Sequence, residues 1–189
     1  MQHPFEAISA NRRGLVFWPL LGITLVLSVV MSIIGRPLTS SAAPGGIVSF
    51  ELAGDVTLAR QIIQSWDGPA RLHAAFSLGL DFLYLVLYST TIGLGCIWVA
   101  AASRARQWPW ADIGAPLAWG LWLAALLDAI ENVALTLALL SIPVEPWPQI
   151  ARWSALGKFT LIVLGLVYVL FGTITYNIAN RLRPREHAV

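Results

Sequence analysis

The sequence predicts an all-α integral membrane protein: a bundle of four transmembrane helices with one extracytoplasmic amphipathic helix between the first and second spans. Of its 189 residues, 57% are hydrophobic and only 12% are charged, a composition typical of polytopic membrane proteins. A span across a hydrocarbon core of about 30 Å takes about 20 apolar residues. Four runs meet this length, at residues 15–35, 74–101, 113–140 and 153–176. We therefore expect one membrane domain over residues 1–189.

The first apolar run follows a short polar arm that ends in Arg12 and Arg13, which are typical cytoplasmic anchors. A cleaved secretory signal is the alternative, because Ser41-Ala42-Ala43 offers small residues at a cleavage position. The run of about 20 residues exceeds the 7 to 15 or so of a signal peptide, so we expect it to be retained. Whether residues 1–43 are ever removed stays open. A stripe of small polar residues predicts a packing face: Thr24, Ser28 and Ser32.

The longest segment between spans contains the predicted amphipathic helix, at residues 55–66. Asp55 is a suitable N-cap, and Gly68 with Pro69 is expected to end the helix. Apolar residues follow helical spacing along it: Val56, Ala59, Ile63 and Trp66. We expect this helix to lie in the membrane interface as an anchor, with a lid over the bundle as the alternative.

The second and third spans each carry a polar stripe. In the second span, Asp81, Tyr84 and Tyr88 stand at i, i+3 and i+7, which places them along one helix face. In the third, Asp128, Glu131 and Asn132 stand at i, i+3 and i+4 and also share a face. Carboxylates in hydrocarbon are unfavourable by about 2.5 to 3.5 kcal/mol, so they usually face a bundle interior or a wet cavity.

Lys158 adds a positive charge from the fourth span. A helix rises about 1.5 Å per residue, so Lys158 and the three acids Asp81, Asp128 and Glu131 all lie roughly 8 to 20 Å beneath the outer surface. We therefore expect a shared polar site. Three acids against one base require that at least one acid be neutral, unless a cation or water compensates.

Three interpretations of this cluster are open. In the first, it is a functional site. In the second, it is a structural network that sets helix register, in which Lys158 pairs with one acid while Asn132 and the tyrosines form hydrogen bonds with the other acids. In the third interpretation, Lys158 extends outward to the membrane surface and takes no part.

The nine tryptophans fall into two groups. Six are predicted in the interfacial belts: Trp18, Trp66, Trp108, Trp110, Trp147 and Trp153. Trp119 and Trp122 are predicted to lie deeper in the third span, where they are candidates to line a ligand cavity. Trp122 is counted among the predicted ligand-binding residues.

Arginines at the span ends predict the orientation. Seven lie on the side that holds both termini: Arg12, Arg13, Arg104, Arg106, Arg181, Arg183 and Arg185. Four lie on the other: Arg36, Arg60, Arg71 and Arg152. Because cytoplasmic loops carry the excess of arginine, we expect both termini in the cytoplasm of a cell whose inner (plasma) membrane holds the protein.

Several classes of function find no support in the sequence. Cys96 is the only cysteine, so an intramolecular disulfide cannot form. The histidines, His3, His73 and His187, lie near span ends or in the tails and cannot form a haem-ligand pair inside the bundle. We expect no metal and no cofactor. The net charge of +2 and the dispersed arginines argue against nucleic-acid binding.

Four segments carry a resemblance to a group of small bacterial four-pass membrane proteins without an assigned function. The segments are 49–54 (SFELAG), 80–84 (LDFLY), 128–134 (DAIENVA) and 151–159 (ARWSALGKF). The resemblance covers roughly residues 47–170, and it implies a fold and a membrane location but no activity. The buried acids in four spans are also loosely similar to sterol isomerase and sigma-2-like proteins, on architecture alone.

The leading functional hypothesis is a protein that binds a lipid-like or small amphipathic ligand at the polar site, alone or as an accessory subunit. The predicted ligand-binding residues are Asp81, Tyr84, Tyr88, Asp128, Glu131, Asn132, Lys158 and Trp122. A cofactor-independent isomerase, cyclase or transferase is the enzyme alternative, with Asp128 or Glu131 as general acid. Transport is disfavoured because four spans give little room for alternating access. Expected partners are membrane lipids, and further copies of the chain or a larger membrane complex.

Overall fold

Four long helices dominate the structure, a computed structural model that describes residues 3–141 and 144–182. They are α1 (Ala10–Gly35), α4 (Gly68–Arg104), α5 (Gly114–Leu140) and α6 (Trp147–Arg181). All four are long and apolar enough to cross a membrane, which confirms the four predicted helices. Three short 3₁₀ turns flank them: η1 (Pro4–Ala7), η2 (Arg36–Leu38) and η3 (Ala111–Ile113). Pro143, Arg183, Arg185 and His187 lie outside the described residues.

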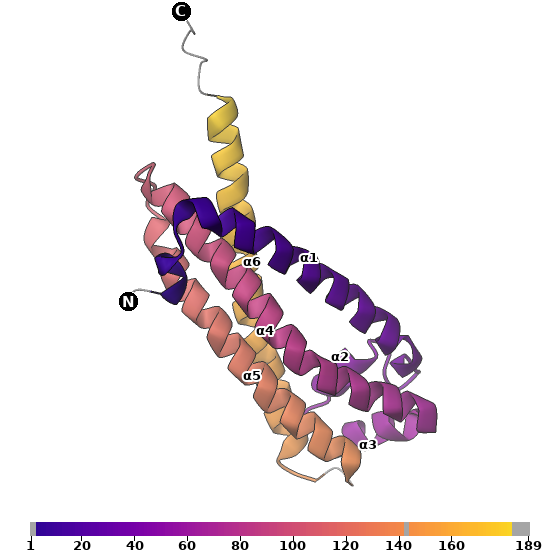
Figure 1. The fold of residues 1–189 in the computed structure, drawn as a ribbon. Helices are drawn as coiled ribbons and strands as arrows, with labels where there is room; N and C mark the ends of the chain where they lie inside the picture. Colours follow the sequence, from indigo (N-terminus) through magenta and orange to yellow (C-terminus); the bar gives the residue numbers. More distant parts are fainter. Residues whose placement is uncertain (1–2, 142–143, 183–189) are drawn as a thin grey trace, which may run out of the picture.

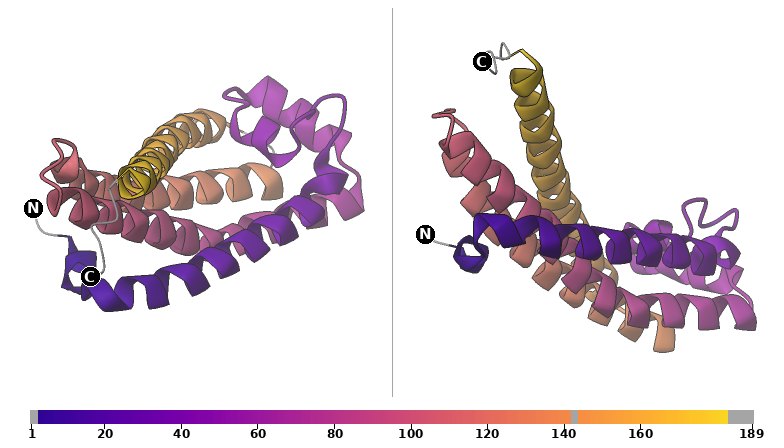
Figure 2. Two further views of the ribbon diagram at one scale, coloured as in Figure 1. Left: turned by 90° about the horizontal axis from the view of Figure 1, so that it is seen from above. Right: turned by 45° about the horizontal axis from the view of Figure 1, so that its top comes forward.

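The helices α4, α5 and α6 pack against one another, whereas α1 packs mainly against α4 (Figure 1). The contacts of α1 run antiparallel to α4. The Phe17 and Trp98 rings have centroids 5.6 Å apart, and the Thr24 and Thr91 hydroxyls are 3.0 Å apart. Thr24 therefore lies on a packing face, as predicted. Figure 2 shows that α6 crosses the other long helices and that its C-terminal end, in yellow, rises away from α1 at the end of the molecule opposite α2 and α3.

Two short helices form the segment between α1 and α4: α2 (Ile47–Glu51) and α3 (Val56–Ser65). The helix α3 is close to the bounds predicted for it, and Asp55 caps it by accepting a hydrogen bond from the Leu58 amide at 2.8 Å. Gly68 and Pro69 are predicted to end this helix, but the helix ends at Ser65 and these two residues begin α4. Asp67 caps α4, and a proline in the first turn lacks only an N–H that has no helical partner there.

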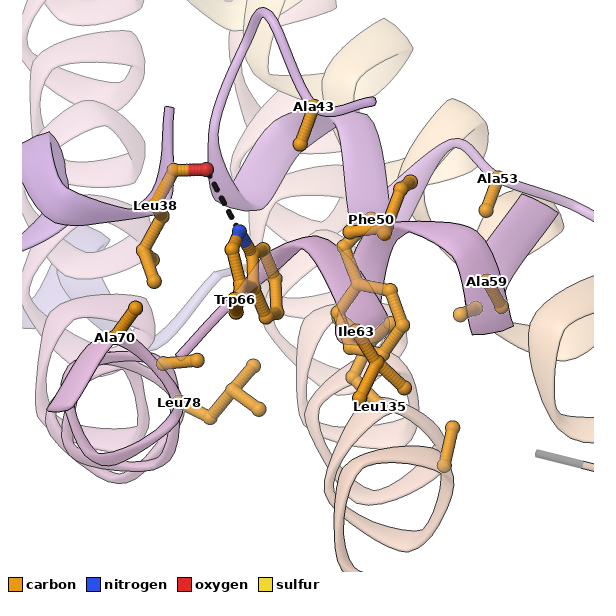
Figure 3. Packing of buried hydrophobic residues seen from close by; sticks show 14 of the residues in the cluster. Leu38, Ala43, Phe50, Ala53, Ala59, Ile63, Trp66, Ala70, Leu78 and Leu135 are labelled. Atoms are coloured by element: carbon orange, nitrogen blue, oxygen red, sulfur yellow. Dashed lines mark hydrogen bonds between the residues drawn. The ribbon is translucent and has the colours of Figure 1, made fainter. Parts of the chain in front are cut away.

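Residues 36–66, which we term the cap, close one end of the helical core (Figure 1). Their apolar side chains form a continuous buried cluster with the ends of α4, α5 and α6, as Figure 3 shows. Phe50 is 1% exposed, and Leu135 of α5 is also 1% exposed. Trp66, predicted in an interfacial belt, is instead 2% exposed and donates its indole N–H to the Leu38 carbonyl at 2.8 Å. The cap therefore shares a hydrophobic core with α4, α5 and α6, which fixes its position on the bundle.

Candidate functional site

Lys158 is the centre of a buried charged cluster. Its Nζ donates a hydrogen bond to Asp128 Oδ1 at 2.7 Å and another to Glu131 Oε1 at 2.9 Å. Glu51 Oε2 lies 3.8 Å from the same nitrogen. The Lys158 side chain is 6% exposed, and that of Glu131 is fully buried. The alternative in which Lys158 extends outward to the surface is therefore wrong.

The close approach of α5 and α6 positions this lysine. A Cβ added at Gly157 would lie 2.9 Å from Leu127 Cδ1, and one at Gly165 would lie 2.6 Å from Leu121 Cδ2. Two glycines on one side of α6 thus let its backbone approach α5. Asp128 and Glu131 stand one helical turn apart on α5, so both carboxylates reach the ammonium group.

A second polar pair joins α5 to α4. Asn132 donates its amide N–H to Asp81 Oδ2 at 2.6 Å, and Asn132 is 2% exposed. The two polar stripes predicted from the sequence therefore face each other. Of the eight predicted ligand-binding residues, the structure brings together seven: Asp81, Tyr84, Tyr88, Asp128, Glu131, Asn132 and Lys158.

The two tyrosines of α4 differ in their partners. Tyr84 accepts a hydrogen bond from Ser28 of α1 at 2.9 Å. Tyr88 is 3% exposed, and its hydroxyl has no hydrogen-bond partner among residues 3–141 and 144–182. A buried hydroxyl without a partner costs about 1 to 3 kcal/mol, so this group has an unused capacity to donate to or accept from a bound molecule.

A cavity of about 220 Å³ lies beside these side chains. Its polar wall is formed by Glu51, Asp81, Tyr84, Tyr88, Asp128 and Lys158. Apolar side chains from α1, α2 and α6 complete it: Met31, Val48, Phe159 and Ile162. The cavity thus has one strongly polar side and one apolar side, the composition of a small-molecule site.

Glu51 also belongs to this site, although it is not among the ligand-binding residues predicted from the sequence. It ends α2, and the buried Phe50 beside it fixes that helix in the cap core. The turn after α2 contains Gly54 at φ +72°, where a Cβ would lie 2.7 Å from the Arg152 guanidinium. Burial raises the pKa of Glu51 above its ordinary value, and the ammonium group of Lys158 opposes this shift. An acid between Phe50 and Leu52 in an otherwise apolar turn was the available signal.

The cluster carries more negative than positive groups. Four carboxylates surround one ammonium group: Glu51, Asp81, Asp128 and Glu131 around Lys158. Fully ionised, the cluster would carry three excess negative charges. A buried site of this kind requires protons on some of the acids, or a cationic or hydrogen-bond-donating occupant.

Trp122 lies elsewhere, in an aromatic cluster with the N-terminal segment. Its ring centroid is 4.7 Å from that of His3 and 5.6 Å from that of Phe5, and Trp119 lies 4.9 Å from His3. His3 is 2% exposed, and burial lowers its pKa, with a smaller opposing effect of Glu6. Trp119 and His3 border a separate hollow of about 480 Å³. Neither tryptophan lines the cavity at Lys158.

Comparison of the chain with known protein families, with characterised proteins and with solved structures finds no match.

Proposed function

We propose that the chain binds a small amphipathic molecule in the cavity beside Lys158. The observation that carries this proposal is the Tyr88 hydroxyl, which is buried, borders the cavity and has no partner among the described residues. The excess of carboxylates around Lys158 adds a second reason, because a bound polar group can offset it. The apolar wall formed by Met31, Phe159 and Ile162 suits the rest of an amphipathic ligand.

The proposed setting is the inner (plasma) membrane, with α1, α4, α5 and α6 as spans, the cap outside and both termini in the cytoplasm. The arginine distribution supports this orientation. Membrane lipids are then the nearest source of ligand, and the protein acts alone, as a homo-oligomer or as an accessory subunit. Thiol labelling of Ser65→Cys in the cap and Arg181→Cys at the end of α6, both with Cys96→Ala, tests the topology. Labelling of both from one side of the membrane would contradict it.

The enzyme alternative rests on a different observation. The Lys158 ammonium lies within 3 Å of both Asp128 and Glu131, so a proton can pass between base and acid, as an isomerase, cyclase or transferase requires. Recovery of the ligand chemically unchanged after prolonged incubation with the protein would favour the binding function. Conversion of the co-purified ligand to an isomer or transfer product would favour the enzyme.

Native mass spectrometry of the purified protein, with extraction of any retained molecule, tests ligand binding directly. We expect one amphipathic molecule per chain in the wild type and at least tenfold lower retention in Tyr88→Phe. The matched control is Tyr168→Phe, which removes a hydroxyl that donates to the Trp110 carbonyl at 3.2 Å, far from the cavity. Equal retention by wild type and Tyr88→Phe, or no retained molecule in any of the three, would contradict the proposal.

A further inference from the structure

A second hollow lies along the same helices as the polar cavity. It has a volume of about 290 Å³ and is formed by α1, α4 and α6 near the end of the molecule opposite the cap. Its walls are mainly apolar and aromatic, with Phe17 and Trp18 from α1, Trp98 from α4, and Val169 and Thr173 from α6. Gly95 is part of its surface, and a Cβ there would lie 3.3 Å from Phe17 and 3.2 Å from Val169.

The helix faces that line the polar cavity continue into this hollow. On α6, Phe159 and Ile162 line the cavity, and Val169 and Thr173 line the hollow. Leu166 stands between them at the same alternating spacing of three and four residues, which keeps all five on one helix face. Leu166 is 41% exposed, so this face is not covered by another helix between the two sites.

The face of α4 follows the same spacing. Tyr84 and Tyr88 line the cavity, Thr91 follows, and Gly95 and Trp98 line the hollow. Thr91 contacts Thr24 of α1, which holds α1 beside α4 at the midpoint. The cavity and the hollow therefore lie along one seam between α1, α4 and α6, which narrows at the buried contact of Thr24 with Thr91.

We propose that one elongated amphiphile occupies this seam, with its polar head in the cavity beside Lys158 and its alkyl tail along α6 as far as Thr173. This inference rests on the proposed function, since it specifies the ligand of the same site. From Lys158 to Thr173 the helix rises about 22 Å, so the tail is a long alkyl chain. An apolar tail in the hollow covers the aromatic side chains of Phe17 and Trp98.

The charges of the site define the head. Lys158 already donates to two carboxylates, and the carboxylates outnumber it. A phosphate or carboxylate head would add negative charge where negative charge is in excess, which is unfavourable in a buried site. A head that donates hydrogen bonds, either an amine or a hydroxyl, fits the acids and the Tyr88 hydroxyl.

Photocrosslinking with alkyl probes that carry a diazirine at the tail end tests this proposal in lipid nanodiscs. The probes are hexylamine, hexadecylamine, hexadecanol and hexadecanoate derivatives. We expect the short probe to label residues around the cavity and the long amine or alcohol to label residues around Trp98 and Thr173. The long carboxylate should label at least tenfold less. The ratio of amine to alcohol labelling distinguishes the two donor heads.

The matched variants place the same bulk inside and outside the hollow. Thr173→Trp fills it and should reduce tail labelling by the long probes at least tenfold, without affecting the short probe. Leu170→Trp, at a residue that is 60% exposed and outside the hollow, should leave both unchanged. Short-probe labelling of the cavity without long-tail labelling of the hollow would overturn this inference alone. Equal labelling by the carboxylate probe would overturn the head assignment. Absence of cavity labelling by every probe would overturn the proposed function as well.

Discussion

The two ends of the helical core both bury polar side chains, but they satisfy them differently. At the N-terminal end, Arg13 donates to the backbone carbonyl of Ile8 at 3.0 Å, and the His3 Nδ1 accepts from the Phe5 amide at 3.2 Å. These partners are all local, and the rings of Trp119 and Trp122 surround His3. At the cap end, the partners of Lys158 come from α2 and α5, far away in the sequence.

This difference indicates different roles. The N-terminal contacts hold one segment against α5 through local backbone hydrogen bonds and ring packing. The cap end assembles four acids and one base from separate elements, and leaves the excess charge and the Tyr88 hydroxyl without a partner in the described chain. Each end keeps a buried polar atom without a partner among the described residues, His3 Nε2 at one end and the Tyr88 hydroxyl at the other. The cap end differs because it also gathers four acids around one base, and this excess of charge favours a bound polar group.

The largest effect is expected from Lys158→Met. Removal of the only base leaves buried carboxylates without their cation, so the free energy of unfolding should fall by about 3 to 5 kcal/mol. Thermal and chemical unfolding in detergent measure it. The control is Asp112→Asn, which breaks an exposed pair with Arg104 at 3.3 Å and should change stability by about 1 kcal/mol or less. Similar losses for the two variants would contradict the distinction between a buried cluster and a surface pair.

Phe50→Ala tests whether the cap core holds Glu51 in the site. Truncation of this buried ring should reduce stability by about 3 kcal/mol or more, and it should also lower ligand retention because α2 loses its anchor. The control is Leu52→Ala, a milder change directly after the same short helix, at a residue that is 36% exposed and does not line the cavity. Full ligand retention in a folded Phe50→Ala variant would show that the cap does not position the site.

A smaller, pH-dependent effect is expected at Glu51. Because burial raises its pKa above 4.5, the folded state holds the proton more tightly than the unfolded state. Its stabilising contribution is complete below pH 4.5 and is lost as the pH rises through the folded-state pKa. Wild type and Glu51→Gln should therefore unfold at similar temperatures in acid, with the variant becoming relatively more stable as the pH rises. A constant difference between the two curves would contradict this assignment.

The smallest effect is expected at His3, where the sign is opposite. Because burial lowers its pKa below 6.5, docking of the N-terminal segment is strongest above pH 6.5 and weakens as the pH falls through the lowered pKa. A spin label on Ala7→Cys should become more mobile over that range. The same label in His3→Phe, which keeps an aromatic ring without a titrating group, should show no such change.

Sequence reasoning located most of the site because the long helices impose simple rules. Apolar length predicted the four helices, and shared depth predicted that Asp128 and Lys158 would meet. The pairing of Asp81 with Asn132 follows from two polar stripes at one level, although the sequence did not specify which groups bond.

The positions of Glu51 and Trp122 depend on tertiary packing, which the hydrophobic periodicity of the sequence does not encode. Glu51 lies in a segment without a long periodic pattern, and its place depends on Phe50 packing and on the turn at Gly54. Trp122 was assigned by depth alone. It precedes Asp128 by six positions and is therefore about 120° away around the helix, so it faces the N-terminal segment and not Lys158.

The most direct test of the central claim is to measure stability and ligand retention together in Asp128→Asn and Glu131→Gln. If the excess acid binds a ligand, both variants should fold with unfolding temperatures equal to or above that of wild type, because each removes a buried charge while keeping its shape. Ligand retention should fall at least tenfold in both. Normal ligand retention in both variants would contradict the account and leave Asp81, Asp128, Glu131 and Lys158 as a network that only sets helix register.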